Sequence, residues 1–576
     1  NFLSQVFRSP FTKFIIPHAF FLSFFFSVGI DKIIEFFSKV KRFRLYFPLL
    51  ILSLIFITYF PAFSQNFFSP LTKVKIPGEY FSLFDYFKHQ DKNKRIALLP
   101  DYTYWGWFAH NWGYNGSGFL WYGIEQPIVS RNFDVWSDKS EGYYWEIKTA
   151  LETEDPKILK NVFDKYGVDF LVYDKSISPI ASSFKGIQYQ RIDQILASTE
   201  GVSLVKNWNY LYVYRIDHQK EAKDFIWVSG SLPNIGPSIK FTNLDNAYLK
   251  YGDYRTEENK PYNAFYPFLD LFTQTQNFTH DWKLVETDSN WRLIRPLPIN
   301  SADFQMISEG QEDVTAFVKN QLLTVDFPKF TVSHFDLINV RAINCGYGYG
   351  DAEKEIDNGA IKLIAKKGAA VCLSFKDNNL KQQYGYIVKI KSKNTHGQRI
   401  LFYVVDSTKD QSFLEDRLAE DTEYYILSPK YQYGLGYELN FHSNSYEKSP
   451  AVNILEDLSI FAAPFNKLKE IRFINSAFPP QKKDAGVDFT VRKHTYYIYE
   501  AKVTSPNSYL ILNQAFHPGW IAWGAGEHFL VNNWANGWKV NSNGTVLIIF
   551  LPQLLEFLGF GISVMILFTR TLFGFK

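Results

Sequence analysis

The sequence predicts a multidomain, membrane-anchored chain with transmembrane helices at both ends, an exterior α/β domain and then β-sandwich domains of jelly-roll type. Three observations support this fold class. Uncharged apolar runs lie near both ends of the 576 residues, helical and strand patterns alternate after the first runs, and many short alternating segments fill the second half. Because a chain of this length exceeds one compact domain, we expect several hydrophobic cores.

The composition excludes several classes of protein. Phe, Tyr and Trp make up 18% of the chain and charged residues 21%, which is typical of membrane segments joined to β-rich exterior domains and not of a disordered chain. The net charge of +3 is too small and too evenly spread for binding through phosphate neutralisation. We therefore expect membrane lipid as a partner and no nucleic acid.

Three apolar runs predict transmembrane helices. Residues 14–30 and 45–63 carry no charge, and a third run, 553–569, ends just before Arg570. A buried core helix is the alternative for the first run. The second run follows a basic cluster made of Lys39, Lys41, Arg42 and Arg44. The positive-inside rule keeps such a cluster in the cytoplasm, so the polar body should lie on the exterior side of the cell membrane.

The pattern along the chain suggests a division into domains. Residues 95–100, 168–174 and 209–217 have strand patterns. Between them, Pro156 opens a helical pattern and Gly167 stands where a left-handed residue would end it. We expect two transmembrane helices (1–63), an α/β domain (64–217), a connector (218–300), a β-sandwich (301–480), membrane-proximal sandwich strands (481–552) and a last transmembrane helix (553–576).

The two cysteines, Cys345 and Cys372, have no histidine or further cysteine at metal-ligand spacing. We therefore expect no metal site. An oxidising compartment would allow one disulfide between them, and two small buried apolar residues are the alternative. The chain also lacks a P-loop, a dinucleotide fingerprint and a Ser-His-Asp order, so we expect no cofactor.

One group of aromatic and polar residues in the α/β domain is a candidate glycan site. Glycan sites combine flat aromatic faces with carboxylates and amides that bond sugar hydroxyls. Packing in the domain core is the alternative for the same residues. Asp134 and Asp138 would in principle also suit a paired-carboxylate glycosidase. The candidate group is Asp101, Trp105, Trp107, His110, Trp121, Arg131 and Asp134, with Trp136 and Asp138 beside it.

A second group precedes the last apolar run. Pro518-Gly519 predicts a type II turn and Asn536-Gly537 a type I′ turn, so these residues have a structural reason to occur. The tryptophans would also suit the aromatic belt above a membrane helix. This membrane-proximal group is His517, Trp520, Asn533, Trp534, Asn536 and Trp538.

The order of several motifs resembles a known family. FRSPFTKF precedes the first run, LLPDYTYWGW, WYGIEQPIVSRNFDVWSD and KYGVDFLVYD follow in the α/β region, and LNQAFHPGWIAW, NNWANGW and FLPQ lead into the last run. With these motifs the chain resembles bacterial polytopic membrane proteins of the YfhO-like and arabinofuranosyltransferase-like kind, in the GT-C class of lipid-linked-sugar glycosyltransferases. The resemblance implies exterior domains over a helical membrane body, with lipid-linked sugar or envelope polysaccharide as partner.

Two functions are compatible with these observations. In GT-C enzymes the catalytic acidic residue lies in the first exterior loop, and nothing in this chain corresponds to that loop. The chain begins at Asn1 without a signal-peptide pattern. We therefore expect the C-terminal part of a GT-C-like glycosyltransferase or glycan-assembly protein that binds or guides cell-envelope glycan, with its catalytic residues elsewhere. The alternative is a non-enzymatic envelope membrane protein whose β-sandwiches bind carbohydrate or protein.

Overall fold

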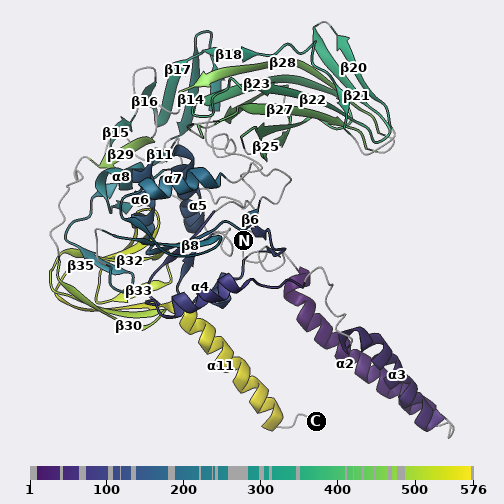
Figure 1. Cartoon of the computed structure of the whole chain (residues 1–576), viewed down its shortest axis with the longest axis vertical. Coiled ribbons are helices and arrows are strands. Elements are labelled where there is room, and N and C mark those ends of the chain that lie inside the picture. Colours follow the sequence, from purple (N-terminus) through teal and green to yellow (C-terminus); the bar gives the residue numbers. More distant parts are fainter. Residues whose placement is uncertain are drawn as a thin grey trace. The chain divides into compact units, whose positions relative to one another are not determined.

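A computed structural model describes the chain as two compact units, Asn1–Ile76 and Pro77–Lys576 (Figure 1). The described residues are 10–38, 43–63, 73–100, 108–116, 118–130, 138–178, 188–218, 222–235, 238–240, 244–256, 283–296, 304–309, 314–345, 350–357, 359–408, 411–419, 421–427, 429–430, 432, 434–446, 449–464, 470–475 and 487–572.

The first unit is helical. Its helices, α2 (Pro10–Ser38) and α3 (Phe43–Phe63), contain the two N-terminal apolar runs. Large apolar side chains on both helices face outward, including Phe20, which is 67% exposed, and Ile57, which is also 67% exposed. Within the described residues, no helix combines the length and apolarity that a membrane crossing needs. The three predicted spans therefore stay a prediction.

The second unit begins with a mixed α/β sheet. β1 pairs in parallel with β4 and β5, and β8 pairs antiparallel with β5 and β7. Helix α4 packs on one face, and α5, α6 and α7 pack on the other, where their apolar residues share one core with the sheet. The bounds are α4 (Gly78–Lys88), β1 (Ile96–Leu99), β4 (Ile128–Val129), α5 (Asp138–Thr153), α6 (Pro156–Tyr166), β5 (Phe170–Asp174), α7 (Tyr189–Ser198), β7 (Val202–Trp208) and β8 (Leu211–Ile216).

Helix α6 shows how the local sequence sets this domain. Asp155 accepts hydrogen bonds from the amides of Lys157 and Ile158, and Pro156 occupies the first turn, where no amide donor is needed. Gly167 ends the helix in the left-handed conformation, with φ 59° and ψ 49°. The predictions of this helix and of strands at 95–100, 168–174 and 209–217 are confirmed.

Two antiparallel sheets form a β-sandwich in the middle of the chain and share one apolar core. Its long strands run side by side in Figure 1. One sheet contains β18 (Thr331–His334), β20 (Ala352–Asp357), β21 (Ala360–Ala365), β23 (Gly385–His396), β26 (Thr422–Leu427) and β28 (Ala451–Ala463). The other contains β19 (Ile343–Asn344), β22 (Ala370–Asp377), β24 (Leu401–Asp406), β25 (Gln411–Arg417) and β27 (Tyr437–Asn444).

Two smaller sheets accompany this sandwich. Trp291 and Phe327 of the first bury against Ile387 and Phe461 of the sandwich. This sheet contains β13 (Lys283–Glu286), β14 (Asn290–Pro296), β16 (Thr315–Lys319) and β17 (Leu322–Pro328). The second joins distant parts of the chain and contains β11 (Ser238–Lys240), β15 (Phe304–Glu309) and β29 (Glu470–Asn475).

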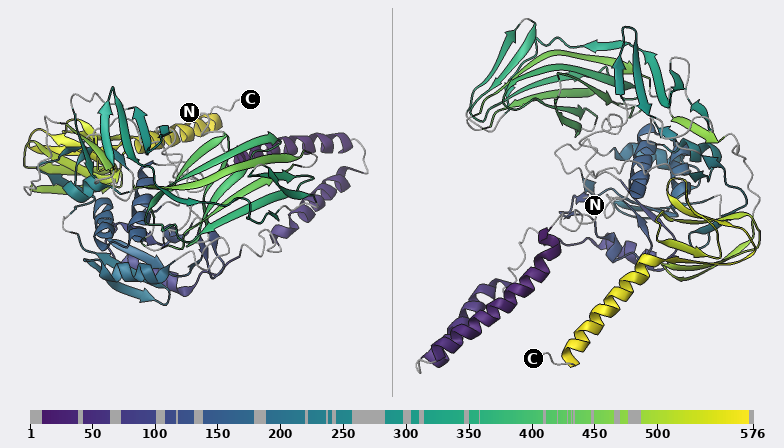
Figure 2. Two further views of the ribbon diagram at one scale, coloured as in Figure 1. Left: turned by 90° about the horizontal axis from the view of Figure 1, so that it is seen from above. Right: turned by 180° about the vertical axis from the view of Figure 1, so that it is seen from behind.

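The C-terminal strands build a second pair of sheets around a core that includes Trp538 and Tyr499. The expected connector takes part in it, because β9 (Ile226–Ser229) pairs with β32 and β12 (Arg255–Thr256) pairs with β34. The remaining elements are β10 (Asn234–Ile235), α8 (Asn246–Tyr251), β30 (Phe489–Thr495), β31 (Ile498–Val503), β32 (Ser508–Ala515), β33 (Trp520–Trp523), β34 (His528–Val531), β35 (Ala535–Val540), β36 (Gly544–Phe550) and α11 (Leu551–Leu572). Figure 2 shows α11 leaving the C-terminal sheets.

Two turn predictions in this region are wrong. Asn536 and Gly537 lie inside β35, and the hairpin turns at Asn532 and Asn533, whose φ values of 55° and 56° suit a type I′ turn. Asparagine tolerates the left-handed region, so Asn532-Asn533 can form the hairpin turn in place of Asn536-Gly537. The Pro518-Gly519 turn exists, since the Trp520 amide donates to the His517 carbonyl, but Gly519 lacks the positive φ of a type II turn.

Arg95 ties the α/β sheet to the C-terminal sheets. Its side chain is only 3% exposed, and its guanidinium donates to the carbonyls of Tyr166 and Asn513. The charge also lies over the ring of Phe225 at 4.7 Å and that of Trp534 at 5.9 Å. Burial lowers the pKa of Arg95 to about 10, which still leaves it charged at neutral pH.

We predict that Arg95→Lys destabilises the second unit by about 2–3 kcal/mol, because an ammonium cannot serve both carbonyls with the fixed fork of a guanidinium. Urea unfolding measures this cost. Arg215→Lys is the matched control, since the Arg215 side chain is 57% exposed in a surface ion pair, and it should cost less than about 0.5 kcal/mol. Equal costs for the two variants would contradict the role assigned to Arg95.

Candidate functional site

The structure describes two members of the predicted glycan group. His110 ends β2 (Phe108–His110), and Trp121 lies in a short 3-10 helix, η2 (Leu120–Tyr122). Asp138 is the first residue of α5. The other members lie outside the described residues, namely Asp101, Trp105, Trp107, Arg131, Asp134 and Trp136.

His110 belongs to a buried polar cluster at the carboxyl end of β5. The Tyr80 hydroxyl of α4 donates to Asp174 Oδ2 at 2.6 Å and lies 3.1 Å from His110 Nδ1. Ser176 Oγ lies 2.9 Å from the same nitrogen, and the Ser176 amide donates to Asp174 Oδ1 at 2.8 Å. Trp112 Nε1 donates to the Tyr80 oxygen at 3.2 Å. We name Tyr80, His110, Trp112, Asp174 and Ser176 the His110 cluster.

The hydrogen bonds of the His110 cluster favour one arrangement of protons. Tyr80 gives its proton to Asp174, so its oxygen is left to accept from Ser176 or His110. A proton on His110 Nδ1 then points toward the buried carboxylate, which stabilises that tautomer electrostatically. In the described part of the chain, the polar contacts of the His110 ring are made by Nδ1. Nε2 then remains as a hydrogen-bond acceptor.

Burial decides the charge of these groups. It lowers the pKa of His110 to about 4, so the imidazole is neutral at pH 7 despite its 3.5 Å distance to Asp174 Oδ2. Burial also raises the pKa of Asp174, while hydrogen bonds from Tyr80 and Ser176 act in the opposite direction. The contact between His110 and Asp174 is therefore a dipole near a carboxyl group and not an ion pair.

Aromatic rings surround the His110 cluster. Trp112 stacks on Tyr114 with ring centroids 5.8 Å apart and an interplanar angle of 22°. Tyr122 is 85% exposed and its ring lies 5.6 Å from that of Trp121. A Cβ on Gly123 would fall 2.3 Å from the Phe84 ring of α4, so Gly123, which follows the Trp121–Tyr122 pair, lies against that helix.

Most of the membrane-proximal group is buried: Trp520 and Trp538 lie in the C-terminal core and Trp534 in the core of the α/β sheet, whereas His517 is exposed. Trp534 is 5% exposed, Trp538 1% and Asn536 0%. Asn536 Oδ1 accepts from the His517 amide at 3.1 Å, and its Nδ2 donates to the Gln514 carbonyl at 2.8 Å. Trp520 is also buried. These contacts support packing of the sheet by Trp534, Asn536 and Trp538.

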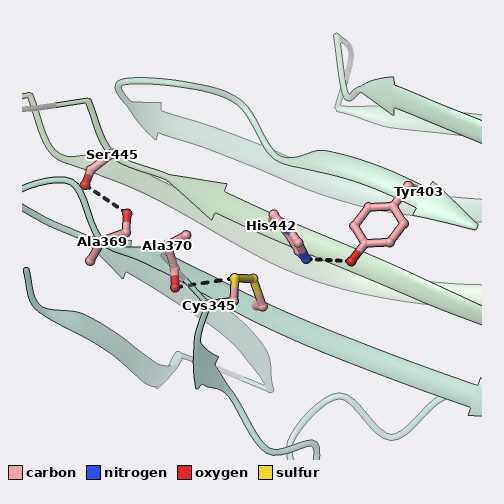
Figure 3. Close-up of a disulfide and its surroundings, with 7 residues drawn as sticks. Cys345, Ala369, Ala370, Tyr403, His442 and Ser445 are labelled. Atoms are coloured by element: carbon pink, nitrogen blue, oxygen red, sulfur yellow. Dashed lines mark hydrogen bonds between the residues drawn. A yellow bond between two sulfur atoms is a disulfide. The ribbon is translucent and has the colours of Figure 1, made fainter. Parts of the chain in front are cut away.

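Polar residues gather around a disulfide on the outer face of the second sheet of the sandwich (Figure 3). Cys345 and Cys372 are joined by a disulfide there, and the Tyr403 hydroxyl lies 2.9 Å from His442 Nε2. The register places Cys372 opposite His442, and Tyr403 opposite Asn440. The spacing of residues in the sequence did not reveal this histidine, because 70 positions separate Cys372 from His442 along the chain. Only strand pairing makes them neighbours.

Sequence reasoning also missed most of the His110 cluster. Tyr80 lies in α4, whereas Asp174 ends β5 and Ser176 follows it in the next turn, so helix packing is what brings Tyr80 to the other two. One signal was available, because ligands of α/β sheets gather at the carboxyl ends of strands, and the predicted strand 168–174 ends in Asp174.

The sequence matches no protein-family model, and no curated protein is significantly similar to it. Among solved structures, the arabinofuranosyltransferase AftD from Mycobacteria aligns at 8% identity and a TM-score of 0.38, over 89% of this chain and 65% of that one. The chain thus spans less than two thirds of the AftD chain.

Two further structures align with parts of the chain. TmCBM61 in complex with β-1,4-galactotriose aligns at 11% identity and a TM-score of 0.18, over 22% of this chain and 91% of that one. The C-terminal globular domain of an oligosaccharyltransferase from Archaeoglobus fulgidus aligns at 11% identity and a TM-score of 0.16, over 25% and 99%. Likeness at these scores does not establish a shared fold or function.

We predict that the neutral state of His110 makes folding stability depend on pH. The unfolded chain binds the proton near pH 6.5 and the folded chain near pH 4, so this stability is present above pH 6.5 and is lost as the pH falls toward 4. His110→Gln removes the effect. The difference in unfolding free energy between wild type and variant should change by about 2 kcal/mol between pH 7 and pH 4.5. A constant difference would show that His110 titrates normally.

Proposed function

We propose that the chain binds cell-envelope glycan at the His110 cluster and the Trp121–Tyr122 pair, as the C-terminal part of a GT-C-like glycosyltransferase or glycan-assembly membrane protein. The observation that best supports this proposal is the environment of His110. The histidine is neutral, contacts the hydroxyl groups of Tyr80 and Ser176 beside the buried carboxyl group of Asp174, and is surrounded by aromatic side chains. This combination of polar acceptor and aromatic faces is what sugar rings require of a protein site.

Each part of the cluster has a role in this proposal. The His110 side chain is 5% exposed, and in this proposal its Nε2 accepts a hydrogen bond from a sugar hydroxyl, because Ser176 and Tyr80 hold the other ring nitrogen. Tyr122 and Trp121 cover the apolar face of a sugar ring, since Tyr122 is exposed and Trp121 lies beside it. Asp101, Trp105 and Trp107 follow β1 in sequence and are proposed as further contacts.

Membrane attachment is also part of the proposal. Helix α11 exposes Leu558 at 60% and Phe560 at 62%, and α2 exposes Phe36 at 68%. Contiguous apolar surface of this kind is unfavourable in water and favourable against lipid. We propose that lipid covers α2, α3 and α11, with the second unit on the exterior side of the cell membrane.

A second candidate function is favoured by the outer face of the sandwich. Tyr403, His442 and Asn440 lie close together there and offer an aromatic ring, an imidazole and an amide. A non-enzymatic envelope protein would bind polymer or a partner protein on this face. The two candidate functions therefore differ in where the ligand binds, at the His110 cluster or on the outer face of the sandwich.

We predict that immobilised envelope polysaccharide retains the full chain and that Trp121→Ala lowers its affinity about tenfold, or ~1.4 kcal/mol, because one stacking face is lost. His110→Phe should also weaken binding, since it keeps an aromatic ring but removes the ring nitrogens and with them the acceptor. Trp105→Ala and Trp107→Ala are expected to weaken binding in the same assay. Biolayer interferometry measures these affinities.

Trp523→Ala is the matched control. Trp523 is 56% exposed, but it ends β33 in the C-terminal sheets, so its loss should leave the affinity unchanged. Tyr403→Phe tests the second candidate. If Tyr403→Phe weakens binding while Trp121→Ala does not, the sandwich face is the binding surface. If no envelope polysaccharide retains the chain, glycan binding is refuted for both surfaces.

A further inference from the structure

Three potential metal ligands meet on the outer face of the sandwich. One ligand atom each from Cys345, Cys372 and His442 lies within 4.8 Å of the other two. Cysteine sulfur and imidazole nitrogen are the donors that zinc prefers in proteins. The proposed glycan-binding cluster uses none of these residues, so this constellation needs its own explanation.

The strands hold the three residues in place. Cys372 of β22 pairs directly with His442 of β27, and Ile343 of β19 pairs with Cys372, which brings Cys345 alongside. The Cys345 amide also donates to the Ala370 carbonyl at 3.0 Å. Because all three backbones belong to one hydrogen-bonded sheet, the ligands are positioned before any metal arrives.

The distances suit a tetrahedral ion. Zinc binds sulfur at about 2.3 Å and nitrogen at about 2.0–2.1 Å, so its ligand atoms lie about 3.5–3.8 Å apart in a tetrahedral site. With the disulfide open, side-chain rotation alone can bring atoms that now lie within 4.8 Å of one another to these separations. Three protein ligands leave the fourth position for water.

Tyr403 supplies the partner that a ligating histidine needs. Its hydroxyl oxygen lies 2.9 Å from His442 Nε2, which leaves Nδ1 for a metal (Figure 3). A histidine bound through Nδ1 carries its proton on Nε2 and donates it to such an oxygen, which fixes the ring orientation. Tyr403 is therefore a positioning residue for the metal ligand.

We propose that Cys345, Cys372 and His442 form a redox-controlled zinc site, which is closed in the disulfide form and binds one Zn²⁺ when the disulfide is reduced. A dithiol reductant provides two electrons and two protons, and becomes a disulfide itself, while Cys345 and Cys372 become thiols. Zinc binding then releases both thiol protons, so two thiolates and one neutral imidazole hold the ion.

The exposure of the two sulfurs fits this order of events. Cys345 is exposed, whereas Cys372 is only 4% exposed. An incoming thiolate can therefore attack the Cys345 sulfur and release Cys372 as the leaving thiolate beside His442. The same exposure lets zinc reach the site without opening the core of the sandwich.

Zinc content of the full chain tests this proposal. The protein is prepared with its disulfide intact or after reduction with a phosphine, exposed to zinc without oxygen, dialysed and measured by elemental analysis. We expect one zinc per reduced chain and none per oxidised chain. Replacement of zinc by Co²⁺ should give a thiolate-to-cobalt charge-transfer band in the reduced chain alone.

Variants assign the ligands. Cys372→Ser should abolish zinc binding, and His442→Ala should lower the affinity at least tenfold while a thiol count shows that its disulfide still forms. Tyr403→Phe keeps all three ligands and should lower the affinity between about 10-fold and 100-fold. His396→Ala removes an exposed histidine from the opposite sheet and should change nothing.

Two results would overturn the proposal. One is a reduced chain that binds no zinc, or binds as much as the oxidised chain. The other is full affinity in both His442→Ala and Tyr403→Phe, which would assign the metal to the cysteines alone. Neither result bears on glycan binding by the His110 cluster, because the two sites share no residue.

Discussion

The buried guanidinium of Arg95 is the interaction on which the arrangement of the second unit depends. Arg95 precedes β1, and its side chain reaches the end of α6 at Tyr166 and β32 at Asn513. One charge thus joins residues more than 400 positions apart in sequence. Two carbonyls and two aromatic rings compensate for its burial. The sheet whose strand ends hold the His110 cluster is thereby fixed against the C-terminal sheets.

The His110 cluster follows from the same layered arrangement. Alternation along β5 turns Asp174 toward α4, where Tyr80 meets it, and the chain returns two residues later with Ser176. Burial then makes the histidine neutral and the carboxyl group harder to ionise. A neutral acceptor surrounded by aromatic rings suits an uncharged ligand rich in hydroxyl groups, and this agreement of charge, burial and shape supports glycan binding.

Elements with strong local signals could be predicted from the sequence. Asp155, Pro156 and Gly167 define α6 by capping alone, and alternation defines the strands of the sandwich. Contacts that depend on pairing could not be predicted. The hairpin turn at Asn532-Asn533 was missed because Asn536-Gly537 also favours a turn. The pairing of β9 with β32 joins segments that are distant in sequence, and His442 approaches Cys372 only across paired strands. For the same reason, the sequence placed His110 in a candidate site but gave no sign of Tyr80.

The location of bound glycan tests the central claim most directly. Hydrogen–deuterium exchange of the full chain, with and without envelope polysaccharide, reports which backbone amides the ligand protects. We expect protection in 108–122 and 174–178, which carry His110, Trp121 and Ser176, and unchanged exchange in the sandwich strands β22, β24 and β27. Protection confined to those sandwich strands, with none around His110, would contradict the account.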